Sequence, residues 1–154
     1  MTTLLYQTDS YLKEFSAKVV DHKPEDSAII LDQTAFYPGG GGQVFDIGCI
    51  KHNDTTTFVK RAKYSNDGIL HIISEEDPVP EVGTEVIGIL DWDRRYKVMR
   101  THTAMHILCG TIFRDYGALV TGGDMDALKG RMDFEFENLT KELVSVIEEA
   151  VNKE

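Results

Sequence analysis

The sequence predicts an α+β protein, in which a small antiparallel β-barrel-like domain precedes an α/β unit with a long helix. Polar and apolar residues alternate over much of residues 1–90, and the short strands this indicates are separated by glycine-containing turns, which is typical of a small barrel or sandwich. From Asp91 onward the apolar residues instead recur at helical spacing. This change of period predicts two domains, residues 1–90 and residues 91–154.

The bulk composition is that of an ordinary globular protein. The 154 residues suffice for one domain or two small ones, and the hydrophobic and charged fractions are 42% and 27%. No apolar run approaches the roughly 18 residues of a membrane span, so no membrane association is expected. The N-terminus lacks the basic start and long apolar stretch of a signal peptide, which predicts a cytoplasmic location.

The net charge of −10 argues against nucleic-acid binding, which normally requires a basic surface. The charge is unevenly distributed, however, because residues 91–131 carry 7 basic and 5 acidic side chains. Four of these basic residues fall in the first half of the predicted long helix, and they form either a solvated face or a set of phosphate contacts: Arg94, Arg95, Lys97 and Arg100.

Residues 1–90 contain the signals of two β-hairpins. Lys18–Val20 and Ser27–Leu31 flank a turn-like segment with a proline, and Thr55–Lys63 is rich in Thr, Val and Phe. Asn66-Asp-Gly68 is a strong turn signal before a returning strand at Ile69–Ile73. Two further elements are expected in this region, a helical turn and a strand: residues 8–14 and Glu85–Leu90.

The second region begins with a helix over Asp93–Tyr116. Two adjoining apolar stripes give this helix a wide apolar face, so we expect it to be largely buried. Asp91 or Asp93 can cap its start, and Gly117 can end it. Beyond it, Arg131–Glu137 alternates like a half-buried strand, and Thr140 can cap a final amphipathic helix.

His102 and His106 are the first candidates for chemistry. Residues at i and i+4 lie on one face of a helix, so two imidazoles so placed can share a metal ion. Thr103 stands where a zinc protease helix has its glutamate, which argues against a peptidase. Cys109 lies about 10 Å of helical rise from His102, too far to complete the site easily. The alternative is that His102 and His106 are ordinary histidines of the helix surface or the core.

The segment from Thr34 to Gln43 is the second candidate. Its four consecutive glycines, at positions 39 to 42, allow positive φ angles or a close approach of the backbone to another surface. It is neither a P-loop nor a dinucleotide-binding fingerprint, because the required lysine and final glycine are absent. It is either a flexible turn between strands or a loop that packs against a ligand.

In combination, these segments resemble the alanyl-tRNA editing family, which comprises the editing domain of alanyl-tRNA synthetase and free-standing editing proteins. The glycine motif followed by His-x3-His is a specific combination, and the resemblance covers nearly the whole chain. The matching stretches are residues 4–12, 31–43, 46–48, 91–96, 99–108 and 117–123.

The resemblance implies hydrolysis of the ester of mischarged tRNA(Ala), chiefly the seryl form, by a zinc-dependent deacylase that binds the acceptor end of the tRNA. His102 and His106 would then be zinc ligands. The substrate-binding residues next to the aminoacyl group would be Thr34, Gly40, Gly41, Gly42 and Gln43.

Two departures from the family pattern bear on activity. Val44 stands where the family usually has proline, and the second metal pair of the family, Cys-x3-His, is expected downstream of a helix such as the one after Thr140. Only two of the usual zinc ligands are therefore expected here. Three hypotheses follow: an editing hydrolase, a non-catalytic binding module, or one half of a split enzyme completed by a separate chain that supplies Cys-x3-His.

Overall fold

The structure is a computed structural model that describes residues 2–154. The chain forms two compact units. One contains the residues up to Gly40 together with Val44–Arg95, and the other contains Gly41–Gln43 together with Tyr96–Glu154. No helix within residues 2–154 is both long and apolar enough to cross a membrane.

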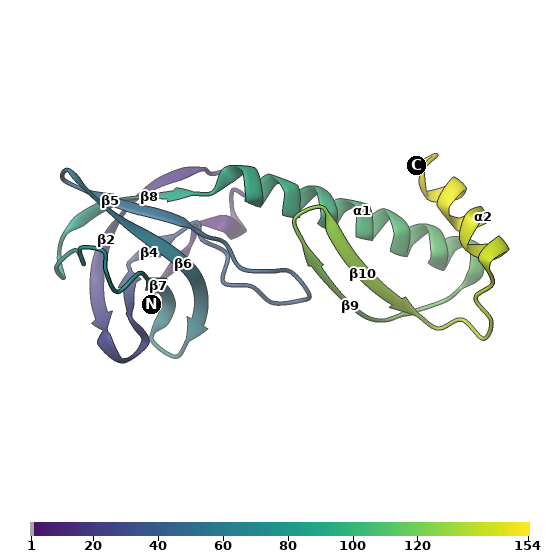
Figure 1. The fold of residues 1–154 in the computed structure, drawn as a ribbon, viewed down its shortest axis with the longest axis horizontal. Helices are drawn as coiled ribbons and strands as arrows, with labels where there is room; N and C mark the ends of the chain where they lie inside the picture. Colours follow the sequence, from purple (N-terminus) through teal and green to yellow (C-terminus); the bar gives the residue numbers. More distant parts are fainter. Residues whose placement is uncertain (1) are drawn as a thin grey trace. The chain divides into compact units, whose positions relative to one another are not determined.

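The first unit is a closed barrel of six antiparallel strands (Figure 1). Around the barrel the strands follow the order β2-β3-β7-β6-β5-β8, so that β8 closes the ring against β2. The α+β prediction with an antiparallel barrel is thereby confirmed. The strands are β2 (Glu14–Lys23), β3 (Ala28–Leu31), β5 (Gly48–His52), β6 (Thr55–Ser65), β7 (Gly68–Ile73) and β8 (Glu85–Leu90).

The barrel is filled by the inward-facing residues of its strands. In β2 every second residue is buried, which is the period of a strand with one face on the core. The two predicted hairpins and the strand at Glu85–Leu90 are present. The interior cluster includes Phe15, Val19, Ile29, Leu31, Phe36, Ile50, Val59 and Ile69.

Short elements complete this unit. β1 (Thr3–Leu4) pairs in parallel with β4 (Gln33–Thr34), and a 3-10 turn, η2 (Pro24–Asp26), joins β2 to β3. The helical turn expected at residues 8–14 lies earlier in the chain, as the 3-10 turn η1 (Leu5–Gln7).

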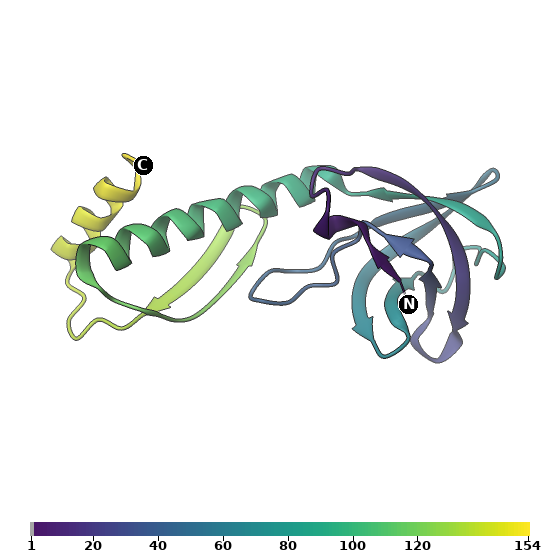
Figure 2. The same cartoon turned by 180° about the vertical axis from the view of Figure 1, so that it is seen from behind.

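The long helix α1 (Trp92–Tyr116) begins in the barrel unit and continues into the second unit. There the hairpin of β9 (Val120–Asp126) and β10 (Lys129–Phe134) lies along α1, and α2 (Lys141–Val151) lies beside its C-terminal end (Figure 2). The apolar contacts that hold α1, α2 and the hairpin together centre on Ile112, Ala118 and Ile147.

The predicted ends of the helices are confirmed. Asp91 Oδ1 accepts the Arg94 N–H (3.0 Å), and Thr140 Oγ1 accepts the Leu143 N–H (3.2 Å). Gly117 ends α1 with φ of +68°, and its N–H donates to the Phe113 carbonyl. A left-handed residue at this position is a common helix terminus that glycine adopts most easily.

Two predictions for this unit were wrong in part. The apolar face of α1 is narrower than expected. Val98, Met105 and Ile112 of one stripe are buried, whereas Tyr96 and Phe113 of the other are 44% and 58% exposed. The strand expected at Arg131–Glu137 begins and ends earlier, as β10, because it pairs with β9. β9 was not predicted, because its Gly122 and Gly123 are typical of a loop.

Candidate functional site

The glycine loop is closed at its base by a buried ion pair. Asp46 exchanges two hydrogen bonds with the backbone of Tyr37: its N–H donates to the Tyr37 carbonyl (2.8 Å), and its Oδ2 accepts the Tyr37 N–H (2.7 Å). The Arg95 Nε donates to the Asp46 carboxylate at 2.9 Å, and Nη2 contacts the same group. A planar guanidinium suits this bidentate geometry.

Arg95 is therefore neither solvated nor available to phosphate, which corrects both interpretations of its place in the basic half of the helix. Its side chain is almost fully buried, and its remaining donors reach the Ser10 carbonyl (3.1 Å) and the Ala35 carbonyl (2.7 Å). Its role in this structure is to join the first turn of α1 to the base of the loop.

The loop itself can be formed only with glycine at several positions. Gly39, Gly40, Gly41 and Gly42 all have positive φ angles, of +84°, +128°, +58° and +81°. A run of such conformations is strongly disfavoured for residues with a Cβ atom, which explains the four consecutive glycines. The Tyr37 hydroxyl donates to the Gly40 carbonyl (3.0 Å) and supports the first half of the loop.

The second half of the loop packs against β9. The Gly42 carbonyl accepts the Met125 N–H (2.8 Å), and Gln43 forms a parallel bridge with Met125. A Cβ atom added to Gly42 would lie 3.0 Å from the Gly123 carbonyl oxygen. Backbone-to-backbone contact of this kind positions the Gln43 side chain. The sequence did not indicate Gly123 or Met125 as part of this site, since β9 was itself not predicted.

The Gln43 side chain meets the two histidines of α1. Gln43 Oε1 lies 2.6 Å from His102 Nδ1, and His102 Nε2 lies 3.0 Å from His106 Nε2. The two imidazole rings are stacked, with centroids 4.9 Å apart and planes 10° from parallel. The structure thus brings together three of the predicted site residues, Gln43, His102 and His106.

This arrangement fixes the tautomer of His102. Because an amide oxygen only accepts, His102 Nδ1 carries the proton and donates to Gln43, and Nε2 keeps its lone pair. Partial burial, and secondarily the charge that His106 can carry, lower the pKa of His102 below its ordinary value. A neutral imidazole is the form that binds metal ions, and the lone pair of His102 Nε2 faces His106 Nε2 in this structure.

The pair fits part of a metal shell. Two nitrogens bound to one tetrahedral zinc at about 2.0–2.1 Å lie roughly 3.3 Å apart, close to the 3.0 Å between the two Nε2 atoms. A hydrogen bond from the other ring nitrogen, as Gln43 accepts, commonly orients a metal-binding histidine. Among residues 2–154, however, no group of three or more His, Cys, Asp or Glu side chains converges on one point.

Thr34 lies in the barrel, where its side chain is fully buried. Its hydroxyl lies 2.8 Å from His71 Nε2 and accepts the Phe36 N–H (3.1 Å). His71 Nδ1 faces the Ile29 carbonyl (3.3 Å), so Nε2 is the acceptor and the Thr34 hydroxyl donates to it. The Thr34 hydroxyl thus donates one hydrogen bond and accepts another inside the barrel. A role for Thr34 in substrate binding stays a prediction.

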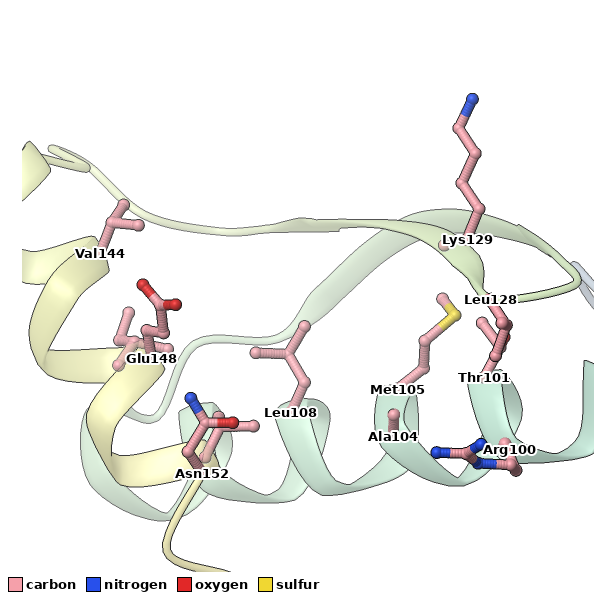
Figure 3. Close-up of a pocket in the computed structure, with 13 residues that line it drawn as sticks. Arg100, Thr101, Ala104, Met105, Leu108, Leu128, Lys129, Val144, Glu148 and Asn152 are labelled. Carbon is pink, nitrogen blue, oxygen red and sulfur yellow. The ribbon is translucent and has the colours of Figure 1, made fainter. Parts of the chain in front are cut away.

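A groove of about 630 Å³ lies between α1, α2 and the turn of the β9–β10 hairpin. Figure 3 shows Met105 and Leu108 projecting from α1, with Glu148 of α2 and Asn152, which follows α2, on the other side of the groove. Lys129 points away from the groove. Apolar side chains of α1 and α2 form much of the lining of the groove. The sequence did not predict this groove, because its third wall comes from the hairpin turn at residues 128–130, which was not predicted.

Comparisons with known proteins give the chain its family. Residues 7–94 match the sequence model of the tRNA synthetases class II (A). The alanyl-tRNA editing protein AlaX-M of Saccharolobus solfataricus is 44% identical over 154 residues, which cover 97% of this chain and 63% of that protein. The AlaX-M protein of Methanosarcina mazei is 41% identical, with 99% and 63% covered.

A longer relative is the alanine–tRNA ligase of Ignicoccus hospitalis, which is 39% identical over 155 residues. That match covers 99% of this chain and 17% of the ligase. The chain spans somewhat less than two thirds of the length of the AlaX-M proteins that it matches. With the family match extending over more than half of its residues, the chain belongs to the tRNA synthetases class II (A) family and is similar throughout to alanyl-tRNA editing proteins.

Proposed function

We propose that this chain acts in alanyl-tRNA editing, in the hydrolysis of the ester that links a wrong amino acid, chiefly serine, to tRNA(Ala). The observation that carries the proposal is the hydrogen-bonded series Gln43–His102–His106, which joins the glycine loop to a potential metal face of α1. The names of its relatives, alanyl-tRNA editing proteins and alanine–tRNA ligases, support the same activity.

In this proposal His102 and His106 hold two positions of a zinc ion through their Nε2 atoms. When bound, the zinc would supply a Lewis acid next to the ester. Gln43 orients the ring of His102 in the tautomer that leaves Nε2 unprotonated. The backbone of Gly40, Gly41 and Gly42 would line the path of the aminoacyl group at the acceptor end of tRNA(Ala), where the missing Cβ atoms permit close approach.

The remaining zinc ligands are proposed to come from a Cys-x3-His segment, for which a separate chain is one source. The reason is the donor set: two imidazoles offer half of a four-ligand shell, and affinity falls with each ligand lost. For the same reason a non-catalytic binding module is the second candidate. A cytoplasmic location is proposed for either, in keeping with translation-related relatives.

The test is to measure zinc binding and seryl-tRNA(Ala) hydrolysis together, first for this chain alone and then with a polypeptide that carries Cys-x3-His from an AlaX-M relative. We expect weak zinc binding and slow hydrolysis by the chain alone, and an increase in both on mixing. His102→Ala and His106→Ala should each abolish the increase. His52→Ala is the matched control, since His52 lies in the barrel at the β5–β6 turn and bonds only to Thr55 among residues 2–154.

Two outcomes would contradict this proposal. Tight zinc binding by the chain alone, lost in His102→Ala, would show that its own residues complete the site. No increase in hydrolysis on mixing, with tRNA binding retained, would favour the non-catalytic module.

A further inference from the structure

A basic strand with exposed aromatic side chains lies on the outside of the barrel. Residues 47–66 span β5 and β6 and contain four basic residues but one acidic residue, Asp54 in the turn, although the chain as a whole has a net charge of −10. The basic residues are Lys51, Lys60, Arg61 and Lys63, and all four are exposed. Within the described residues, 2–154, none of these four forms an ion pair.

A β-bulge places two of these cations side by side. In a regular strand Lys60 and Arg61 would point to opposite faces, and one of them would enter the barrel. The register of β6 against β7 shifts between Val59 and Arg61, so that Val59 and Ala62 face inward while Lys60 and Arg61 are both exposed. Bulges often redirect side chains in this way, and this one keeps both Lys60 and Arg61 on the outer face.

Aromatic rings accompany the charges. Phe58 is 58% exposed, although it lies in the middle of the barrel wall and neighbours Cys49 across the β5–β6 pair. The Phe45 ring has two guanidinium groups next to it, those of Arg61 (4.8 Å) and Arg94 (5.7 Å). Arg61 thus lies beside an aromatic ring on the outside of the barrel, an arrangement that cation–π attraction stabilises.

A hollow of about 550 Å³ lies at the same place. Cys49 and Ile89 contribute to its lining, together with Phe58 and Lys60. The surroundings bury the Cys49 thiol enough to raise its pKa, and the Lys51 charge opposes that effect only in part. Asp91, whose carboxylate caps the start of α1, completes the polar part of the lining. The hollow thus offers a largely apolar surface with an aromatic ring and a cation, to which a planar base can bind while its phosphate contacts the lysine.

We propose that this surface, the β5–β6 face formed by Lys51, Phe58, Lys60, Arg61 and Lys63, binds RNA. Its cations contact the phosphate backbone and Phe58 stacks on an unpaired base. The inference deepens the proposed function and rests on it for the identity of the RNA as tRNA(Ala). It concerns the barrel alone and is independent of the histidine site.

RNA fits this surface better than an acidic protein does. An acidic segment would satisfy the cations, but it would gain little from an exposed ring beside an apolar hollow. A nucleotide uses both, because every base presents a π-face and every nucleotide carries one phosphate. The acidic-protein alternative is therefore an outcome of the test below.

The test is the binding of uncharged tRNA(Ala) transcript to the full chain by fluorescence anisotropy over a range of KCl concentrations, with chelator present so that zinc plays no part. Lys60→Gln/Lys63→Gln should weaken binding about tenfold and reduce the slope of log K against log salt by roughly 1.5. Phe58→Ala, and also Phe58→Leu in case the alanine variant misfolds, should weaken binding by about fivefold to a hundredfold.

The matched control is Lys18→Gln/Lys153→Gln, which removes the same charge elsewhere. Lys18 lies on β2, which is opposite β6 in the six-strand ring, and Lys153 follows α2. We expect less than about a twofold effect of this control on tRNA binding.

An equal loss of tRNA affinity in Lys60→Gln/Lys63→Gln and in Lys18→Gln/Lys153→Gln would overturn the proposal, since net charge alone would then explain binding. Displacement of the tRNA by polyglutamate at matched charge would overturn it in favour of an acidic protein. Binding of tRNA(Ala) through this surface, with no hydrolysis even when zinc and the Cys-x3-His polypeptide are present, would contradict the proposed function and support this surface. Hydrolysis under those conditions that no β5–β6 variant affects would overturn the surface and leave the proposed function standing.

Discussion

At the scale of single residues, Arg95 shows how far a charged side chain can depart from the role that its neighbours suggest. It stands among basic residues at the start of a helix, yet it is buried against Asp46 and two backbone carbonyls. Nothing local in the sequence distinguishes it from Arg94 or Arg100. The difference arises from Asp46, which is far away in sequence and which only the fold brings to this position.

Arg95→Ala should lower the free energy of unfolding of the barrel by about 3–5 kcal/mol, because it leaves the Asp46 carboxylate buried without its partner. Urea denaturation measures this. Arg100→Ala, at an exposed position of the same helix, is the control and should change little. The double variant Arg95→Met/Asp46→Leu should recover part of the lost free energy of unfolding, because it removes both charges. If it were less stable than Arg95→Ala, an unpaired buried carboxylate would not be the cause of the loss.

His71 gives the barrel a defined response to acid. Complete burial is the main cause that lowers the pKa of His71 to about 4 from 6.5. Since the folded pKa is below the unfolded value, the contribution of His71 to stability is fully present above pH 6.5 and is lost as the pH falls from there towards 4. Protonation would also break the hydrogen bond in which Nε2 accepts from Thr34.

The expected loss between pH 7.5 and pH 5 is about 2 kcal/mol of unfolding free energy from this one group. Urea denaturation at the two pH values measures it, with His71→Gln as the comparison. The variant should be less stable at pH 7.5 but should lack this part of the pH dependence. An unchanged pH dependence in His71→Gln would show that other groups cause it.

At the scale of elements, the glycine loop and the β9–β10 hairpin explain why the candidate site was predictable only in part. The spacing of His102 and His106 identifies a shared helix face from sequence alone, and the glycine run indicates an unusual backbone. Their connection through Gln43 depends on the contact of the loop with β9. That strand escaped prediction because adjacent glycines carry no β signal, although here they let two backbones approach.

The glycines of the loop are required for two reasons, positive φ angles and close approach to β9, and alanine substitutions can separate these two effects. Gly41→Ala introduces a Cβ atom with nothing within 4 Å at φ of +58°, a left-handed region that alanine reaches at a cost of about 1 kcal/mol. Gly42→Ala adds the approach to the Gly123 carbonyl at 3.0 Å. Gly42→Ala should therefore displace Gln43 from His102, whereas Gly41→Ala should not.

The nitrogen chemical shifts of the His102 ring report this directly, because they distinguish the tautomer with the proton on Nδ1. We expect that tautomer to persist in Gly41→Ala and to become mixed in Gly42→Ala. The same mixed signal in both variants would mean that backbone strain alone governs the loop, and that its contact with β9 is unimportant.

At the scale of the whole molecule, the local signals of the sequence were sufficient for the class of fold and for most strand positions. They were not sufficient for the closure of the barrel. The pairing of Glu14 with Ile89, and of Cys49 with Ile89, joins segments that lie far apart in sequence, and period-2 alternation carries no information about such partners. The exposure of α1 also depended on which elements cover it, which a helical pattern leaves open.

The closed ring of the barrel has a consequence for self-association. A sheet that closes on itself has no unpaired edge, so none of the six barrel strands offers a template on which another chain can extend a sheet. The two-stranded hairpin differs, because among residues 2–154 only β9 pairs with β10. Lys129, Arg131 and Asp133 place a charge at every second residue of β10, a pattern that discourages edge-to-edge aggregation. Protection against polymerisation is thus topological in the barrel and electrostatic in the hairpin, and only the second kind can be screened by salt.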